Sequence, residues 1–138
     1  MHEKRIEIRW RDMDAFGHVN NAVYLTYLEE NRDDWMQEMF EAKGEAIDYV
    51  VVRAEIDYRR ELTQKDGAVI VRCRLDRLGS SSIHLREEIA TLDGRLAAEA
   101  RVVLVVRDPG TSRARPLTGA ERATLERAAG RTGRRADG

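Results

Sequence analysis

The sequence predicts an α+β domain in which a five-stranded antiparallel sheet wraps around one long helix. Five segments alternate apolar and polar residues with the period of two that marks half-buried strands, and one segment, after the first strand, repeats apolar residues at helical spacing. Turn-forming pairs such as Asp66-Gly67 and Asp93-Gly94 separate the later strands. Because only this helix has a long apolar face, it should cover the single apolar face of the sheet.

The first strand and the helix are joined by an irregular segment. Ile6, Ile8 and Trp10 alternate with charged residues, which predicts a strand that ends at Trp10. Residues 11–19 are rich in turn-formers, and Asn20 or Asn21 can cap the following helix. The helix should end at about residue 42, before Gly44. Its predicted apolar face consists of Tyr24, Tyr27, Leu28, Trp35, Met39 and Phe40.

The residues after the helix predict four strands, within 50–59, 69–75, 81–92 and 96–106. Glu87 interrupts the apolar face of the third of these, where it could mark a bulge, a sheet edge or a carboxylate that reaches the surface. The predicted edge strand carries no proline or evident bulge to protect it, so we expect it to pair with a second copy of the chain.

The C-terminal region predicts a short helix from Thr118 to Ala129, with Thr118 and Glu121 forming a capping box. Residues 130–138 offer no core-forming side chain and are expected to be disordered and dispensable, so the folded domain should comprise residues 1–129. Seven arginines against three acids make the chain basic from residue 113 onward. No aromatic residue is interleaved to stack on bases, which favours a solvated tail over a nucleic-acid arm.

Composition limits the possible functions. A chain of 138 residues makes one domain, and its net charge of −1 argues against nucleic-acid binding. A charged share of 36%, no apolar run long enough to cross a bilayer and a charged start predict a cytoplasmic protein without membrane attachment. Cys73 is the only cysteine, which excludes an internal disulfide and a multi-cysteine metal site and predicts a buried structural thiol.

Residues 12–24 contain the candidate catalytic residues. Asp14 should stand close to the free N–H groups of the first helical turn, which can bind an oxyanion. Acyl transfer needs a base or nucleophile together with donors aimed at the carbonyl oxygen. Gly17 permits a sharp bend or the close approach of a ligand. Asp14 can equally be a cap of the helix. His18 can equally be a structural imidazole held by hydrogen bonds.

Two motifs resemble one known family. Residues 10–21 read WRDMDAFGHVNN and are followed by YLTYLEE at 24–30, while residues 77–82 read RLGSSS and are followed by EEI at 87–89. Both resemble the 4-hydroxybenzoyl-CoA thioesterase-like branch of the hotdog superfamily, and the resemblance covers residues 3 to about 106. It implies the hotdog fold, a dimer that joins two sheets edge to edge, and a thioester site at the subunit interface.

The resemblance also implies roles for single residues. Asp14 matches the catalytic aspartate, which in this family either attacks the thioester or activates water, and it is favoured over Asp12 for this reason. The backbone N–H near Asn21 matches the group that polarises the carbonyl. His18 matches a catalytic histidine of the related plant acyl-carrier-protein thioesterases, but those enzymes have Asn where this chain has Phe16, so a role in bracing the loop stays open.

The predicted function is hydrolysis of an acyl-CoA to a free acid and CoA, without a metal or other cofactor, by a homodimer or homotetramer. A non-catalytic acyl-CoA or acyl-carrier-protein binding module and an acyl-carrier-protein thioesterase are the alternatives. An enoyl-CoA hydratase of the same fold would require a different Asp and His arrangement. Arginines near the site could meet CoA phosphates or be merely solvated. The predicted substrate-binding residues are Gly17, Asn20, Tyr24, Arg59, Arg77, Ser81 and Ser82.

Overall fold

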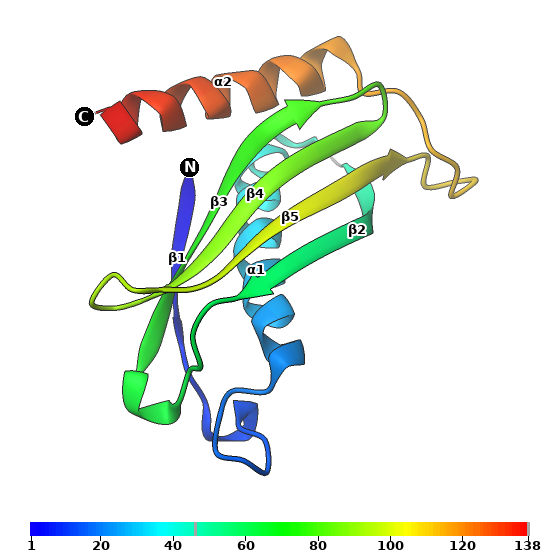
Figure 1. Cartoon of the computed structure of the whole chain (residues 1–138). Coiled ribbons are helices and arrows are strands. Elements are labelled where there is room, and N and C mark those ends of the chain that lie inside the picture. The colour runs from blue at the N-terminus through cyan, green and yellow to red at the C-terminus, as the bar shows by residue number, and fades with distance from the viewer. Residues whose placement is uncertain (46, 138) are drawn as a thin grey trace.

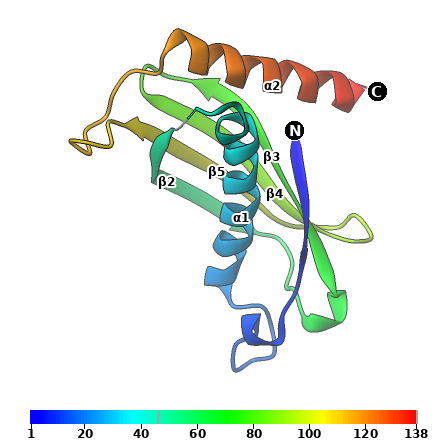
Figure 2. The ribbon, with the colours of Figure 1, turned by 180° about the vertical axis from the view of Figure 1, so that it is seen from behind.

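The computed structural model describes residues 1–45 and 47–137 and confirms the α+β hotdog architecture. All strand pairs are antiparallel, and the sheet order is β1-β3-β4-β5-β2. Helix α1 lies against one face of this sheet, whereas α2 crosses one end of it beside β3 (Figures 1 and 2). The elements are β1 (His2–Glu7), α1 (Asn21–Met39), β2 (Asp48–Tyr58), β3 (Ala68–Leu78), β4 (Ser82–Thr91), β5 (Leu96–Arg107) and α2 (Gly119–Asp137).

Helix α1 forms as its sequence predicts. Asn20 is the N-cap, and its side-chain Oδ1 accepts a hydrogen bond from the N–H of Ala22 at 2.9 Å. After Phe40 a single 3₁₀ turn, Glu41–Lys43, extends the helical path to Gly44, which has the left-handed φ of 76° typical of a helix end. All members of the predicted apolar face are buried: Tyr24, Tyr27, Leu28, Trp35, Met39 and Phe40. They join the strands in one hydrophobic core.

The interruption at Glu87 is a buried ion pair, so the three interpretations of it from sequence are wrong. β4 is the central strand, and Glu87 points from it toward α1, where its Oε1 accepts a hydrogen bond from Arg32 Nη1 at 2.8 Å. Burial raises the pKa of the Glu87 carboxyl, and the Arg32 charge opposes that rise. Cys73 is buried nearby, as predicted, and its thiol pKa is raised well above the usual value by burial and by the Glu87 charge.

Two predicted strand details differ from the structure. β1 ends at Glu7, and Trp10 instead begins a 3₁₀ turn, Trp10–Asp12, that leaves its side chain 78% exposed. The ladder between β2 and β5 shifts between Val51 and Arg53, so Val52 bulges out of register and is 57% exposed. The expectation of an edge strand without a bulge is therefore wrong for β2. A run of β-branched residues in the sequence does not indicate where a bulge will form.

The C-terminal helix begins with the predicted capping box. Thr118 Oγ1 accepts a hydrogen bond from the N–H of Glu121 at 3.1 Å, and Glu121 Oε1 accepts one from the N–H of Thr118 at 2.8 Å. Leu125 and Ala128 anchor α2 in the main core. The helical backbone continues to Asp137, past the predicted end at Ala129, although this extension includes Gly130 and Gly133, which are weak helix formers. The domain boundary at residue 129 stays a prediction.

Neither of the long helices can cross a membrane. Across residues 1–45 and 47–137, no helix is both long enough and apolar enough to span a bilayer. Both α1 and α2 carry charged residues throughout their length. Their apolar side chains are used to pack on the sheet.

The buried ion pair yields a stability prediction. Glu87→Leu leaves the charge of Arg32 buried without a partner, so we expect the free energy of unfolding to fall by about 3–5 kcal/mol in urea titrations. The double variant Arg32→Met/Glu87→Leu removes both charges and should recover most of this loss. Glu3→Gln, which disrupts an exposed pair with Arg72, is the control and should cost at most about 1 kcal/mol. A Glu87→Leu cost no larger than that of the control would contradict the prediction.

Candidate functional site

The segment between β1 and α1 folds into a closed loop with Asp14 at its base. Met13 and Val19 form an isolated antiparallel bridge, and the N–H of Asp14 donates to the carbonyl of His18 at 2.8 Å. Gly17 turns the chain with a φ of 81°, in the left-handed region that favours glycine. Val19 in turn donates its N–H to the carbonyl of Leu62 at 2.8 Å. The loop is thus fixed both internally and to the rest of the protein.

Asp12 is a structural anchor. Its buried carboxylate accepts hydrogen bonds from the hydroxyl of Tyr27 at 2.7 Å and from the N–H of Arg9 at 2.9 Å. Burial tends to raise the pKa of Asp12, but these hydrogen bonds and the Arg9 charge outweigh it, so the pKa lies below its usual value. The carbonyl of Asp12 also accepts from the N–H of Asn20, directly before the helix. Asp12 therefore joins the start of the loop to α1.

Asp14 has the more open environment. One carboxylate oxygen, Oδ1, accepts hydrogen bonds from the N–H of Phe16 at 2.9 Å and of His18 at 3.4 Å. Among the described residues, none donates to the other oxygen, Oδ2. The side chain is half-buried and lines two adjoining surface hollows. One oxygen is held by the backbone while the other stays available to a ligand or water.

The start of α1 offers an unused hydrogen-bond donor. Asn20 occupies the next donors of the first turn, since its Oδ1 binds the N–H of Ala22 and its carbonyl binds the N–H of Val23. In the part of the chain that the structure describes, the N–H of the exposed Asn21 has no acceptor. Tyr58 donates its hydroxyl to the carbonyl of Asn21 at 3.0 Å and so fixes the helix start to the end of β2.

His18 pairs with a residue that the sequence did not single out. Its Nε2 lies 3.2 Å from Oε2 of Glu61, and both side chains are partly exposed. Glu61 follows two arginines after β2 and is distant in sequence, so no motif pointed to it. Among the described residues, the imidazole of His18 makes no hydrogen bond or ion pair with the carboxylate of Asp14. It is compatible with either of the two roles predicted for His18.

The hollows around Asp14 combine apolar and basic surfaces. One is lined by Trp10, Met13 and Ala15 together with Arg11 and Lys65. The other, reached past His18, is lined by Tyr24, Tyr58, Arg59, Arg60 and Glu61. Phe16, on the loop itself, is 84% exposed. Such surroundings suit a ligand with an apolar part and an anionic part.

The structure divides the predicted substrate-binding residues into two groups. Gly17, Asn20, Tyr24 and Arg59 lie around the Asp14 loop. Arg77, Ser81 and Ser82 lie at the opposite end of the sheet, where β4 begins near Asp48, the start of β2 (Figure 1). Ser82 is level with Val50 across β5, and Val50 lies eight residues from the Tyr58 end of β2, which corresponds to about 26 Å along the strand. Within one chain the two groups do not meet, and the binding roles predicted for them stay predictions.

The distant group is held by its own local contacts. Ser82 Oγ lies 3.0 Å from Nε2 of His84, and a Cβ on Gly79 would come within 2.2 Å of Ser82 Oγ. Burial, together with the Arg77 charge, lowers the pKa of His84. Within residues 1–45 and 47–137, no group of three or more His, Cys, Asp or Glu residues is arranged to hold a metal ion.

Comparisons with known proteins agree on one family. The family model described as the thioesterase-like superfamily matches residues 8–125. The long-chain acyl-CoA thioesterase FadM of Escherichia coli is 33% identical over 129 residues, which cover 90% of this chain and 96% of FadM. A Thermus thermophilus thioesterase complexed with coenzyme A and Zn has a TM-score of 0.81 and 34% identity, covering 94% of this chain and 95% of that one. YbaW, a probable thioesterase from E. coli, gives a TM-score of 0.78 and 32% identity, covering 94% and 99%.

The anchoring role of Asp12 predicts a pH-dependent loss of stability. Asp12→Asn should lower the free energy of unfolding at pH 7 by about 1–3 kcal/mol, because it weakens buried hydrogen bonds to a charged group. The folded-state pKa of Asp12 is depressed, so its stabilisation is present above the unfolded-state pKa and is lost as the pH falls through the folded-state pKa. The difference in the free energy of unfolding between parent and variant, measured by urea titration, should therefore become smaller toward acid pH. A difference that is constant with pH would count against this role. A larger loss of unfolding free energy from Asp14→Asn would also count against it.

Proposed function

The chain belongs to the thioesterase-like superfamily, and we infer that it is an acyl-CoA thioesterase that releases a free acid and CoA. FadM, named as a long-chain acyl-CoA thioesterase, and the thioesterase complexed with coenzyme A support this substrate class. The observation that carries the inference in this chain is the half-free Asp14 carboxylate beside the unused Asn21 N–H at the start of α1. The two are the base or nucleophile and the donor that acyl transfer requires.

In the proposed reaction the thioester carbonyl oxygen accepts a hydrogen bond from the Asn21 N–H, at the positive end of the helix dipole. Acting as a base, Asp14 takes a proton from water while the water oxygen attacks the carbonyl carbon. The tetrahedral intermediate then expels CoA as a thiolate, which leaves the acid. Acting as a nucleophile, Asp14 displaces the thiolate itself, and water then cleaves the resulting anhydride. Both routes use the same free oxygen of Asp14.

The surroundings of Asp14 favour an apolar acyl group. Trp10, which precedes the Asp14 loop, is 78% exposed, and Phe16, on the loop itself, is 84% exposed. Large exposed aromatic side chains commonly mark a surface that binds an apolar partner. Arg59 and Arg60 lie on the other side and can meet the phosphates of CoA. Together with the name of FadM, this arrangement supports a long-chain acyl-CoA as substrate.

A homodimer through β2 would complete the site. β2 pairs only with β5 among the described strands, and its Val51 and Val52 are exposed. Antiparallel pairing of two β2 strands sets the Asp48 end of one copy beside the Tyr58 end of the other. That arrangement brings the sheet end with Arg77, Ser81 and Ser82 in one copy toward the Asp14 loop of the other. The two groups of predicted binding residues then contribute to one site across the two-fold axis.

Substitution of Asp14 tests the catalytic assignment. Asp14→Asn preserves the size of the side chain but removes the base or nucleophile, so we expect kcat with a long-chain acyl-CoA to fall by about two or more orders of magnitude. Release of thiol from an acyl-CoA panel is the measurement. Asp12→Asn, assayed where it is fully folded, is the control and should change kcat much less. Near-parental hydrolysis by the Asp14 variant would overturn the assignment of Asp14, whereas a parent that releases no thiol from any acyl-CoA would leave the chain as an acyl-CoA binding module.

Mixed dimers test the shared site. Asp14→Asn and Arg77→Glu should each lower hydrolysis when alone, because each removes one half of every site. After co-refolding in equal amounts, half of the dimers should contain one intact site, which restores activity to about a quarter of the parental level. No recovery above the separate variants, or a monomer mass in light scattering at micromolar concentration, would argue against the interface.

A further inference from the structure

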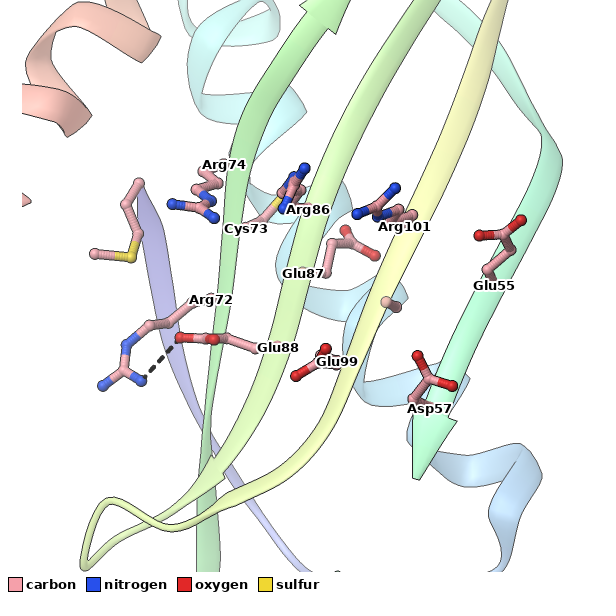
Figure 3. Close-up of a pocket in the computed structure, with 12 residues that line it drawn as sticks. Glu55, Asp57, Arg72, Cys73, Arg74, Arg86, Glu87, Glu88, Glu99 and Arg101 are labelled. Atoms are coloured by element: carbon pink, nitrogen blue, oxygen red, sulfur yellow. Dashed lines mark hydrogen bonds and ion pairs between the residues drawn. The ribbon is translucent and has the colours of Figure 1, made fainter. Parts of the chain in front are cut away.

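Tyr58 is the last residue of β2, and its side chain leaves the sheet on the α1 side. Asp57, directly before it, lies on the opposite face with Glu99 (Figure 3), and successive side chains of a strand point to opposite faces. The end of β2 lies beside the first turn of α1 (Figure 1), where the Tyr58 hydroxyl donates to the carbonyl of Asn21 at 3.0 Å. Tyr58 thus binds the residue whose N–H has no acceptor within residues 1–45 and 47–137.

The end of β2 is itself firmly held. Tyr58 is the cross-strand partner of Ala98 on β5, which is fully buried. The next two residues, Arg59 and Arg60, both donate their N–H groups to the carbonyl of Ala97, at 2.8 and 3.1 Å. The sheet therefore fixes the backbone of Tyr58, and the hydroxyl of this side chain gives the start of α1 a fixed point of attachment.

A second tyrosine makes the reverse contact. Tyr24 extends from the first turn of α1, and its hydroxyl donates to the carbonyl of Arg60 at 3.0 Å. The rings of Tyr24 and Tyr58 meet edge to face, with centroids 5.0 Å apart and planes at 75°. Each element thus sends one side chain to the backbone of the other. Tyr24 is buried whereas Tyr58 is 44% exposed, so loss of the Tyr58 hydroxyl should cost less stability than loss of the Tyr24 hydroxyl.

These contacts fix the direction of the Asn21 N–H. The peptide group that carries this N–H joins Asn20 to Asn21, and its carbonyl accepts a hydrogen bond from the N–H of Val23 at 2.9 Å. The next peptide group is held through its carbonyl by Tyr58. Because the peptide groups on both sides of the Asn21 Cα are bound, rotation about its φ and ψ is restricted. A donor that is held in place before the reaction needs no reorganisation when charge develops on the carbonyl oxygen.

The segment 58–62 holds both the helix start and the Asp14 loop. The helix start is bound through Tyr58, and the loop is bound through the N–H of Val19, which donates to the carbonyl of the fully buried Leu62 at 2.8 Å. One short segment therefore sets the position of the Asn21 N–H relative to the Asp14 carboxylate. Without the Tyr58 hydroxyl the loop stays attached to this segment, but the helix start can shift relative to it.

We propose that Tyr58 is a positioning residue of the reaction, which holds the carbonyl of Asn21 and so keeps the N–H of the same residue aimed at the thioester carbonyl oxygen. The inference rests on the proposed function, in which this N–H and Asp14 act together. A displacement of about 1 Å at a reacting centre lowers a rate by about two orders of magnitude, and loss of one hydroxyl permits a smaller displacement. The transition state depends on the N–H more than the bound substrate does, so the loss appears in kcat rather than in KM.

Tyr58→Phe removes the hydroxyl and keeps the ring that contacts Tyr24. We expect kcat for a long-chain acyl-CoA to fall about tenfold, with KM within about twofold and the melting temperature within about 2 °C of the parent. The loss in kcat should be equal from about pH 6 to about pH 9, because Tyr58 transfers no proton in this role. A rise in KM with unchanged kcat would make Tyr58 a substrate contact, and a loss confined to one end of the pH range would make it an acid or base. Either result would overturn the proposal.

Val71→Ala is the control for a general loss of stability. Val71 is fully buried on β3 and lines neither hollow around Asp14. Its truncation leaves a cavity, so it should lower the melting temperature more than Tyr58→Phe does. The kcat of the folded control should nevertheless stay within about twofold of the parent. A control that loses as much kcat as Tyr58→Phe would show that stability alone governs the rate, and the positioning role would be wrong.

Ligand affinity tests the same donor without turnover. Two long-chain acyl-CoA analogues are compared by calorimetry: a ketone in which CH₂ replaces the thioester sulfur, and a fully reduced form in which CH₂ also replaces the carbonyl. The parent should bind the ketone more tightly than the reduced form, and Tyr58→Phe should diminish this preference about threefold. The affinity for the reduced form should stay within about twofold, because it offers the Asn21 N–H no acceptor.

The two measurements separate this inference from the proposed function. An equal preference for the ketone in parent and Tyr58→Phe would overturn the role of Tyr58, even if the parent hydrolyses acyl-CoA. A parent that hydrolyses no acyl-CoA but loses its preference for the ketone on Tyr58→Phe would overturn the hydrolysis alone. In that case Tyr58 would still position the Asn21 N–H toward a bound carbonyl.

Discussion

The seating of α1 on the sheet is the constraint on which the remaining features of this protein depend. The apolar side chains of α1 pack into one core with the strands, and polar contacts at two levels add to this packing. Near its start, Tyr27 binds the carboxylate of Asp12, and near its middle Arg32 binds Glu87 on the central strand. Because hydrogen bonds between buried groups are costly to break, they set one position for the helix. That position places the free N–H of Asn21 beside the Asp14 loop.

The role of each charged side chain in this protein depends on its surroundings rather than on its residue type. Asp12 and Glu87 are buried acids whose partners are fixed within the chain. Asp14 is held by one oxygen and is open at the other, which suits a group that must react. On the far face of the sheet, acids and arginines are only partly paired and remain exposed. The first group stabilises the fold, the second supports chemistry, and the third remains accessible to solvent.

Most of the fold follows from local patterns, whereas the site follows only in part. The period-two segments, the face containing Tyr27 and Leu28, and the capping box at Thr118 were predictable because each depends on neighbours in sequence. The partner of Glu87 could not be predicted, since Arg32 lies 55 residues away. The bulge at Val52 and the Glu61 contact of His18 depend on how strands meet. Arg77 lies far from Asp14 because β3 runs away from the Asp14 loop and carries Arg77 near its other end. The motifs alone do not encode the direction of a strand.

The unequal edges of the sheet bear on aggregation. One edge is β2, with 11 residues and a bulge, and the other is β1, with only 6 residues, among them Glu3, Arg5 and Glu7. When two sheets join through β2, both long edges are paired. The edges that remain free are the short, charged β1 strands, which are poor templates for adding further strands. Growth along the hydrogen-bonding direction would then stop at ten strands. A dimer of the proposed kind would therefore use its long edges for assembly without extending into a fibre.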